Sequence, residues 1–249
     1  MPEYEFRHAN AEEARLLRPL WQECFGDDAQ FMACYEAQMF RPERVELALL
    51  NGEAVSMLTI LPMTLCRDGK RMPGGCVYGV ATRSDHRGRG LATQLLQAAC
   101  RRLDHEVDCL AVVPDTPELF PYYSRTMLAR TAFYVREIQL HAEQLTDRSP
   151  LNPQPAKAED YLAARRDCLR GHTFLDWDRQ AVYFQRQICR QEGGDLFLFS
   201  GIPGCAAVQR PGPFGALPLM LGGSAEPFGM LAGPYLSDGE KAYLGFDFA

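Results

Sequence analysis

Lysine is nearly absent from this chain of 249 residues, which holds only Lys70, Lys157 and Lys241. None of these lysines stands in the Gly-Lys-Ser/Thr order of a P-loop, which excludes that kind of nucleoside-triphosphate site. A dinucleotide-binding fingerprint fits poorly as well, because Gly88 and Gly90 are followed by Thr93 where that motif needs its third glycine.

Paired cysteines are also missing. Nine cysteines are spread singly, no Cys-x-x-Cys occurs and the count is odd. This spacing argues against a disulfide framework and against a zinc site, so we expect no metal. Several cysteines stand inside apolar segments, where the thiol behaves as a small hydrophobic group. We therefore expect reduced thiols and a cytoplasmic protein.

The chain has no long apolar run and no excess of positive charge. The apolar stretch from Leu196 to Val208 is broken by a Gly/Pro turn, and residues 1–5 do not begin a signal segment, so no membrane association is expected. The formal net charge of −6 argues against general binding of nucleic acid.

The most informative segment present is a strand, a basic turn and a helix in succession. The β-branched run Val77–Thr82 predicts a strand, and the periodic leucines of Leu91–Leu103 predict an amphipathic helix. Between them, Gly88 and Gly90 let the backbone turn and expose N–H groups. The positive end of a helix and the neighbouring arginines add positive charge there, which predicts a phosphate or pyrophosphate site.

Within this segment, Arg87-x-x-Gly90-x-Ala92 resembles the pyrophosphate motif of the GNAT superfamily of acetyl-CoA-dependent N-acetyltransferases. The resemblance implies acetyl-CoA as cosubstrate, held by the strand end and by the loop. The implied cofactor-binding residues are Val80, Ala81, Thr82, Arg87, Gly88, Arg89, Gly90, Leu91 and Ala92. The alternative is a plain surface turn between a core strand and a core helix.

Periodicity and turn residues predict an α/β (α+β) fold in the order β-α-α-β-β-β-α-β-α-β, which is the order of a GNAT domain with a mixed, mostly antiparallel central sheet flanked by helices. Asn51-Gly52 predicts the tight turn of a hairpin. The expected elements are Tyr4–His8, Ala11–Phe25, Ala29–Met39, Val45–Leu50, Glu53–Pro62, Val77–Thr82, Leu91–Leu103, Asp108–Val113, Pro117–Arg125 and Thr131–Leu140.

The second half of the chain reads as a smaller α+β domain. The proline-rich segment 143–157 predicts a linker between a domain at 1–142 and one at 158–249. Two helices, about 158–169 and 176–192, and two short strands are expected beyond it. The run Asp195–Gly201 echoes Glu46–Gly52, so this half is either a degenerate GNAT-like copy or an unrelated accessory domain.

A candidate catalytic tyrosine follows the next strand. Leu119-Phe-Pro-Tyr-Tyr123 resembles the Leu-Tyr-x-x-Tyr-x-x-x-Gly-Phe segment of the GNAT family, in which the second tyrosine protonates the departing thiolate. The resemblance gives this role to Tyr123 and leaves Tyr122 as a packing residue. Met127-Leu128 replaces Gly-Phe, which is a departure from the family pattern.

Residues near the N-terminus extend the resemblance to acetyltransferases of the enhanced-intracellular-survival type, over about residues 3–140. Members of that type acetylate aminoglycoside or lysine amines and carry a second GNAT-like domain and a sterol-carrier-like third domain. The chain is too short for the third domain. By this resemblance Trp21, Phe25 and Tyr78 would bind the acceptor.

Together these patterns predict an acetyl-CoA-dependent N-acetyltransferase that acts on a primary amine without a covalent enzyme intermediate. The acceptor is left open between a small molecule, such as a polyamine or aminoglycoside, and a lysine side chain. The oligomeric state and the length of the acyl chain also stay open. The alternative from another class is a non-catalytic acyl-CoA-binding sensor or interaction module.

Overall fold

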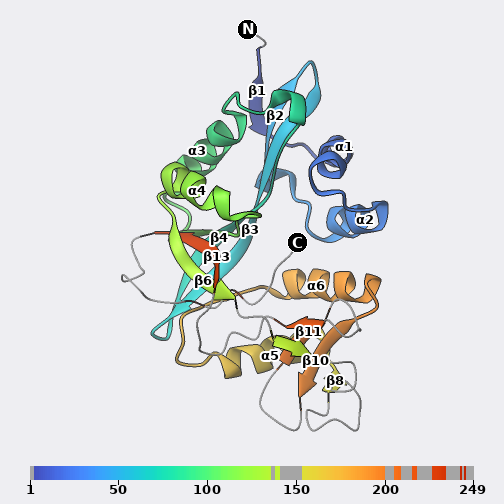
Figure 1. Cartoon of the computed structure of the whole chain (residues 1–249), viewed down its shortest axis with the longest axis vertical. Helices are drawn as coiled ribbons and strands as arrows, with labels where there is room; N and C mark the ends of the chain where they lie inside the picture. Colours follow the sequence, from blue (N-terminus) through green and yellow to red (C-terminus); the bar gives the residue numbers. More distant parts are fainter. Residues whose placement is uncertain are drawn as a thin grey trace. The chain divides into compact units, whose positions relative to one another are not determined.

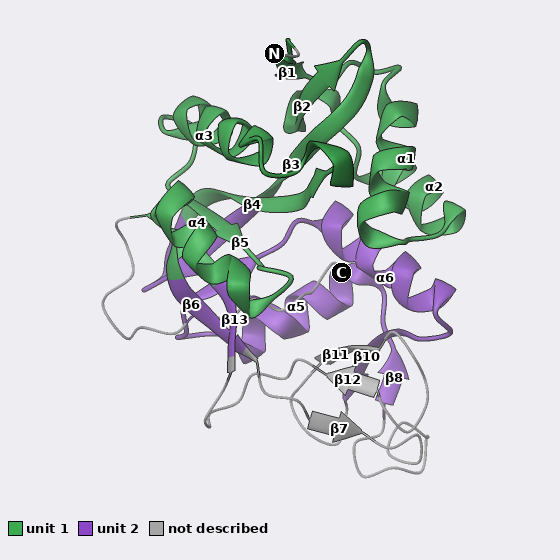
Figure 2. Ribbon diagram, turned by 45° about the horizontal axis from the view of Figure 1, so that its top comes forward, with its two compact units in different colours: residues 1–62, 72–130, 230–236 green, residues 63–71, 131–229, 237–249 purple. Residues whose placement is uncertain are grey.

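The structure is a computed structural model that describes residues 3–135, 138–140, 153–199, 205–208, 215–217, 226–233, 242 and 244. The chain divides into two compact units. Unit 1 comprises residues 1–62, 72–130 and 230–236, and unit 2 comprises residues 63–71, 131–229 and 237–249 (Figure 2). In the described part of the chain, no helix has both the length and the apolar character that crossing a membrane requires.

Unit 1 is built on a mixed sheet with the strand order β1-β2-β3-β4-β5-β13. The printed pairs are antiparallel except for β4 and β5, which run parallel. The strands are β1 (Glu5–His8), β2 (Val45–Leu50), β3 (Glu53–Arg67), β4 (Lys70–Thr82), β5 (Cys109–Val112) and β13 (Glu226–Ala232). This mixed, mostly antiparallel sheet flanked by helices confirms the predicted fold class.

Helices cover both faces of this sheet. In Figure 1, α1 (Ala14–Phe25) and α2 (Ala29–Gln38) lie on one side, and α3 (Leu91–Leu103) and α4 (Phe120–Met127) on the other. Short 3-10 turns, η1 (Pro42–Arg44), η2 (Ser84–His86) and η3 (Pro117–Leu119), precede β2, α3 and α4. The leucines of α3 predicted to face inward are all buried and form one cluster with β3, β4 and β5.

Two turns with left-handed residues join the long strands of unit 1. At the predicted hairpin, Asn51 and Gly52 both have positive φ, at 52° and 82°. Asp68 and Gly69 also have positive φ, at 50° and 73°. At this turn β3 continues to Arg67 instead of ending near Pro62, and β4 begins at Lys70 instead of at Val77. Both pairs fit the turn type that matches the twist of antiparallel strands. The two strands that meet at the second turn are longer than predicted.

Unit 2 contains α5 (Ala158–Cys168), α6 (Arg179–Gln191) and a small antiparallel sheet in the order β11-β10-β8. Its strands are β8 (Pro153–Pro155), β10 (Asp195–Phe199) and β11 (Cys205–Val208), and further strands are β6 (Arg130–Val135), β7 (Ile138–Leu140), β9 (Phe174–Asp176) and β12 (Gly215–Leu217). The predicted helix at 176–192 begins later, because Asp176 ends β9 and the Asp178 side chain caps α6.

The order of elements in unit 2 repeats the start of unit 1. In unit 1, β1 and β2 pair antiparallel across two helices, and β3 follows β2. In unit 2, β8 and β10 pair antiparallel across α5 and α6, and β11 follows β10. However, β9 lies between α5 and α6 and no strand lies between α1 and α2, so the choice between a degenerate copy and an unrelated domain stays open. Most of the predicted linker lies outside the described residues, so the domain boundary stays a prediction.

Candidate active site

A bulge in β4 marks the centre of the candidate site. The Tyr78 ring lies 5.6 Å from the Trp21 ring, and a Cβ on Gly79 would come within 2.8 Å of the same indole. Two consecutive residues therefore face one side of the strand, which breaks the alternation of an ordinary strand. Gly79 has φ of +59°, a conformation that favours glycine.

The parallel ladder between β4 and β5 ends just before this bulge, where β5 itself ends. Its last paired residues are Val77 and Val112, whereas β4 runs on to Thr82. Beyond Val77, no described strand pairs with the edge of β4 that faced β5, and an extended ligand binds to such an edge by adding main-chain hydrogen bonds. The structure thus places Val80, Ala81 and Thr82 along a strand edge, as their predicted cofactor role requires.

The loop after β4 leads directly into the N-terminus of α3. Gly88 and Gly90 have φ of +74° and +75°, and no atom lies within 4 Å of a Cβ built on either glycine. The first helical bond of α3 runs from Gln94 N–H to Gly90 O, and no side chain caps the helix. The N–H groups of Leu91 and Ala92 are left without a partner inside the helix, as at any helix start. These groups and the helix dipole together favour an anion.

Arg87 and Arg89 supply positive charge and form no direct ion pair among the described residues, although Arg87 lies near enough to Glu23 to help lower the pKa of that carboxyl group. Arg87 Nε donates to Thr82 O at 3.1 Å, and Arg89 donates to Tyr4 Oη at 2.9 Å and to Asp85 O at 3.0 Å. All of these acceptors are uncharged. By contrast, Arg83 pairs with Glu53 at 3.1 Å and with the Asp85 carboxylate at 3.2 Å. Two oriented guanidinium groups that are not paired directly with an acid suit a diphosphate.

Two residues near the end of α1 are hydrogen-bonded to the end of β4 and the start of this loop. Glu23 accepts a hydrogen bond from Ser84 N–H at 2.7 Å, and the Cys24 thiol donates to Thr82 O at 3.5 Å. The hydrogen bond from Ser84 keeps the pKa of Glu23 below its usual value. Sequence reasoning missed this contact because the residues involved are about sixty positions apart.

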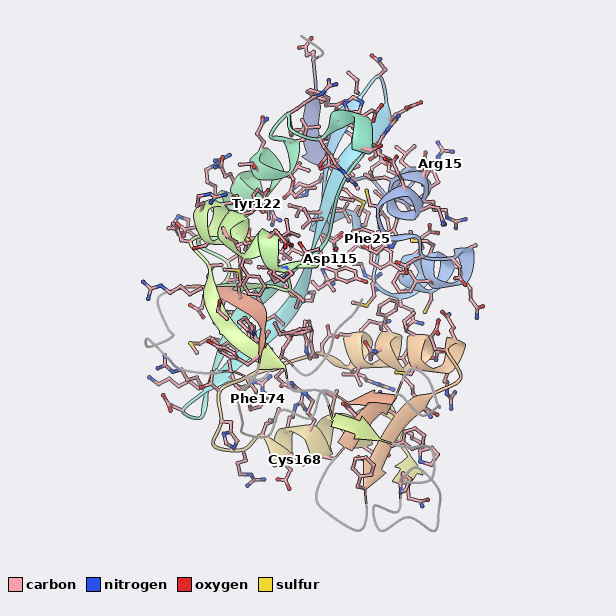
Figure 3. All side chains as sticks on the ribbon, in the orientation of Figure 1. Arg15, Phe25, Asp115, Tyr122, Cys168 and Phe174 are labelled. Atoms are coloured by element: carbon pink, nitrogen blue, oxygen red, sulfur yellow. The ribbon has the colours of Figure 1, made fainter. Side chains whose placement is uncertain are left out.

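Aromatic side chains of α1, α2 and β4 form a cluster on the α1 side of the candidate site, which we call the aromatic wall. The Trp21 ring lies 5.0 Å from Phe25 and 4.9 Å from Tyr35, and its Nε1 donates to Asp27 at 2.6 Å. Of the three predicted acceptor-binding residues, Phe25 is 42% exposed, Tyr78 is half-buried and Trp21 is only 2% exposed. Trp21 therefore supports the aromatic wall, whereas Phe25, labelled at the end of α1 in Figure 3, is accessible.

The predicted catalytic Tyr123 lies in α4, against the α3 side of the sheet. It is 5% exposed, and no hydrogen bond of its hydroxyl is found in the described part of the chain. Burial raises the pKa of the phenol, and Tyr122 and the Asp115 carboxylate add to the effect. The neighbouring Tyr122 bonds to Thr93 Oγ1 at 3.3 Å, so its hydroxyl already has a partner. Figure 3 labels Tyr122 and Asp115.

Asp115 is not the N-cap of either helical segment that follows it. The residue that precedes η3 is Thr116, and the one that precedes α4 is Leu119. Asp115 is exposed and close enough to Tyr123 to act on its pKa. A carboxylate after the end of β5 is therefore part of the electrostatic surroundings of the phenol.

The departure from the family pattern at the end of α4 has a structural cost. Leu128 ends the helix in the left-handed conformation, with φ of 57°, and its side chain is 81% exposed. Glycine is the residue that adopts this conformation without a Cβ clash.

Leu128→Gly is therefore expected to stabilise the protein by about 0.5–1 kcal/mol, because relief of left-handed strain exceeds the entropy cost of glycine. Urea unfolding measures the change. Leu128→Ala is the matched control, because it removes the exposed side chain and retains the strain. Equal stability of the two variants would contradict this reading of the helix end.

The cysteines offer no obvious nucleophile. Eight of them are free thiols, and the side chain of the ninth, Cys205, is not described. Burial raises the pKa of Cys109 to about 12. Since the thiolate is the nucleophile, such a thiol is inert at neutral pH. Within the described residues, no group of three or more His, Cys, Asp or Glu side chains is placed to hold a metal ion.

A parallel strand pair whose ladder ends beside an uncapped helix N-terminus is the arrangement that the candidate site offers to a phosphate-bearing ligand. The sequence of residues 5–126 matches the family model described as "Acetyltransferase (GNAT) domain". This is the superfamily that the motif resemblance predicted. No curated protein matches the sequence.

Solved structures agree on the fold. A GCN5-related N-acetyltransferase from Anabaena variabilis matches with a TM-score of 0.64 at 17% identity, over 79% of this chain and 51% of that chain. A GCN5-related N-acetyltransferase from Kribbella flavida matches with a TM-score of 0.61 at 15% identity, over 82% of this chain and 53% of that chain. Eis1 from Mycobacterium abscessus matches with a TM-score of 0.61 at 14% identity, over 82% of this chain and 52% of that chain. The chain thus spans about half the length of these similar proteins.

Proposed function

We propose that the protein is an acetyl-CoA-dependent N-acetyltransferase that moves the acetyl group directly to a primary amine. The observation that carries this proposal is the end of the β4–β5 ladder at Val77 and Val112, next to the loop that leads into α3. A strand edge for the pantetheine arm and an anion site for the diphosphate then follow each other along the chain.

The donor would bind in two parts. The diphosphate would accept hydrogen bonds from the N–H groups of Leu91 and Ala92 and from the guanidinium groups of Arg87 and Arg89. The pantetheine arm, which carries amide groups, would pair with Val80–Thr82 in the manner of an added strand. An N–H group of β4 near the bulge would donate to the thioester oxygen and stabilise it as it becomes negative.

The reaction needs one bond made and one bond broken at the acetyl carbon. The neutral amine nitrogen attacks the carbonyl carbon, and the C–S bond breaks as the tetrahedral intermediate collapses. Tyr123 donates a proton to the departing thiolate of CoA, and the proton lost by the amine passes to water and restores the phenol. The products are the acetamide and CoA, with no acyl-enzyme.

The acceptor would lie against Phe25 and Tyr78, the two accessible aromatic residues of the aromatic wall. Apolar rings at this position suit the carbon skeleton of an amine and leave its nitrogen directed at the thioester. A polyamine, an aminoglycoside and a lysine side chain all fit this description. A cytoplasmic location and a homo-oligomer remain expectations.

Arg87→Ala is expected to weaken acetyl-CoA binding about 10- to 100-fold, because a charged hydrogen bond to phosphate is lost. Calorimetric titration with acetyl-CoA measures the change. Arg101→Ala is the control, since it removes the same charge from the exposed far end of α3 and should retain wild-type affinity. Equal weakening by both variants would mean that overall charge, and not this loop, attracts the ligand.

A further inference from the structure

Tyr4, a residue outside every motif considered so far, is hydrogen-bonded to two side chains of the anion-binding loop. Its hydroxyl accepts from Arg89 Nη1 at 2.9 Å and lies 3.0 Å from His86 Nδ1. Its ring packs edge-on against the imidazole, with centroids 5.8 Å apart. Tyr4 immediately precedes β1, so about eighty residues separate it from the loop it contacts.

The proton positions in this cluster follow from which groups can donate a hydrogen bond and which can accept one. Arg89 can only donate, so the Tyr4 oxygen accepts from it and the hydroxyl proton remains for His86 Nδ1. His86 Nε2 lies 3.7 Å from the Asp85 carboxylate, which suits an N–H at that nitrogen. His86 is 8% exposed and is therefore shielded from water, whereas Asp85 and Arg89 are exposed.

We infer that Tyr4 is a positioning residue for acetyl-CoA, acting through Arg89. The inference rests on the proposed function and adds to it a residue that does not touch the donor. Arg89 is long and exposed, and a long side chain loses rotamer entropy when it is fixed against a ligand. Two anchors, the Tyr4 hydroxyl and Asp85 O, hold the guanidinium beside the loop before the diphosphate arrives. Part of the entropy cost of binding is then met during folding.

Tyr4→Phe removes the hydroxyl and keeps the ring. It is expected to raise the Kd and the KM for acetyl-CoA about 3- to 10-fold, the size of one immobilised side chain. The kcat with the best amine from the panel described in the Discussion should change less than twofold, since nothing at the reacting carbon is altered. Tyr183→Phe, on the exposed face of α6, is the matched control and should equal the wild type in all three constants.

A double-mutant cycle separates positioning from a general structural effect. If Tyr4 acts through Arg89, Tyr4→Phe should add nothing to the Kd once Arg89→Ala is present. The same fold-change in both backgrounds, or a wild-type Kd for Tyr4→Phe alone, would overturn the inference while leaving the proposed function intact. Failure of the wild type to bind acetyl-CoA would overturn both.

Discussion

Replacing Tyr123 with phenylalanine is expected to lower kcat by about 100-fold or more, the usual contribution of a placed general acid. The Kd for acetyl-CoA should stay within about twofold, because the ring is retained and the diphosphate is held elsewhere. The phenol is 5% exposed and belongs to the apolar core cluster, and no hydrogen bond of its hydroxyl is found among the described residues.

The protonation state of Tyr123 also suits this role. Burial raises the pKa of the phenol above its ordinary value of 10. An alkyl amine loses its proton near pH ~10, where an ordinary tyrosine would begin to ionise. With the pKa raised, the phenol is still protonated when the amine becomes neutral. Activity should therefore rise with pH through the titration of the amine and fall only above the pKa of a free phenol.

Tyr122→Phe is the control for this prediction. It removes the hydroxyl of the adjacent tyrosine, whose partner is Thr93, and should leave kcat close to the wild-type value. Stopped-time release of CoA thiol gives kcat for both variants. A full loss in Tyr122→Phe with normal turnover in Tyr123→Phe would reverse the assignment.

Gly79→Ala is expected to destabilise the protein by about 2–4 kcal/mol, the sum of left-handed strain and overpacking. The new Cβ would lie 2.8 Å from the Trp21 ring, and Trp21 is only 2% exposed, so the indole has little room to move. A shift of Trp21 would also disturb the bulge in β4 beside the candidate site. Thermal unfolding and acetyl-CoA binding should both be impaired.

Gly52→Ala separates the contribution of left-handed backbone strain from that of overpacking. Gly52 has φ of +82°, and no atom lies within 4 Å of a Cβ built there, so only backbone strain is added. It should cost about 1 kcal/mol, at the lower end of left-handed strain. If Gly79→Ala were no more destabilising than Gly52→Ala, close packing of Trp21 on β4 would not be the reason for this glycine.

The loop was predictable from sequence because its parts are adjacent in the chain. A β-branched strand, two glycines among arginines and a leucine-periodic helix specify their own local structure, and α3 spans Leu91–Leu103 as predicted. The positions of Arg87, Gly88, Arg89 and Gly90 then follow from the turn itself. No long-range information is needed for a site built from one strand–loop–helix unit.

Other parts of the site depend on contacts between distant residues, which local patterns do not encode. The close approach of Trp21 to Gly79 requires α1 to pack on β4, and Tyr4 reaches Arg89 only after β1 has joined the sheet. β13, which pairs with β5 through Met230–Ala232, lies in a stretch whose glycines and prolines suggested only a break in helix. In each case tertiary packing, and not local propensity, decides the structure.

The most direct test of the account is release of CoA thiol from acetyl-CoA by the wild-type protein with a panel of primary amines. The panel holds a polyamine, an aminoglycoside and a lysine peptide, and mass spectrometry identifies any acetylated product. The account predicts turnover with at least one amine, lost in Tyr123→Phe and weakened through KM in Arg87→Ala. Tight binding of acetyl-CoA with no transfer to any amine would contradict it and favour a non-catalytic acyl-CoA-binding module.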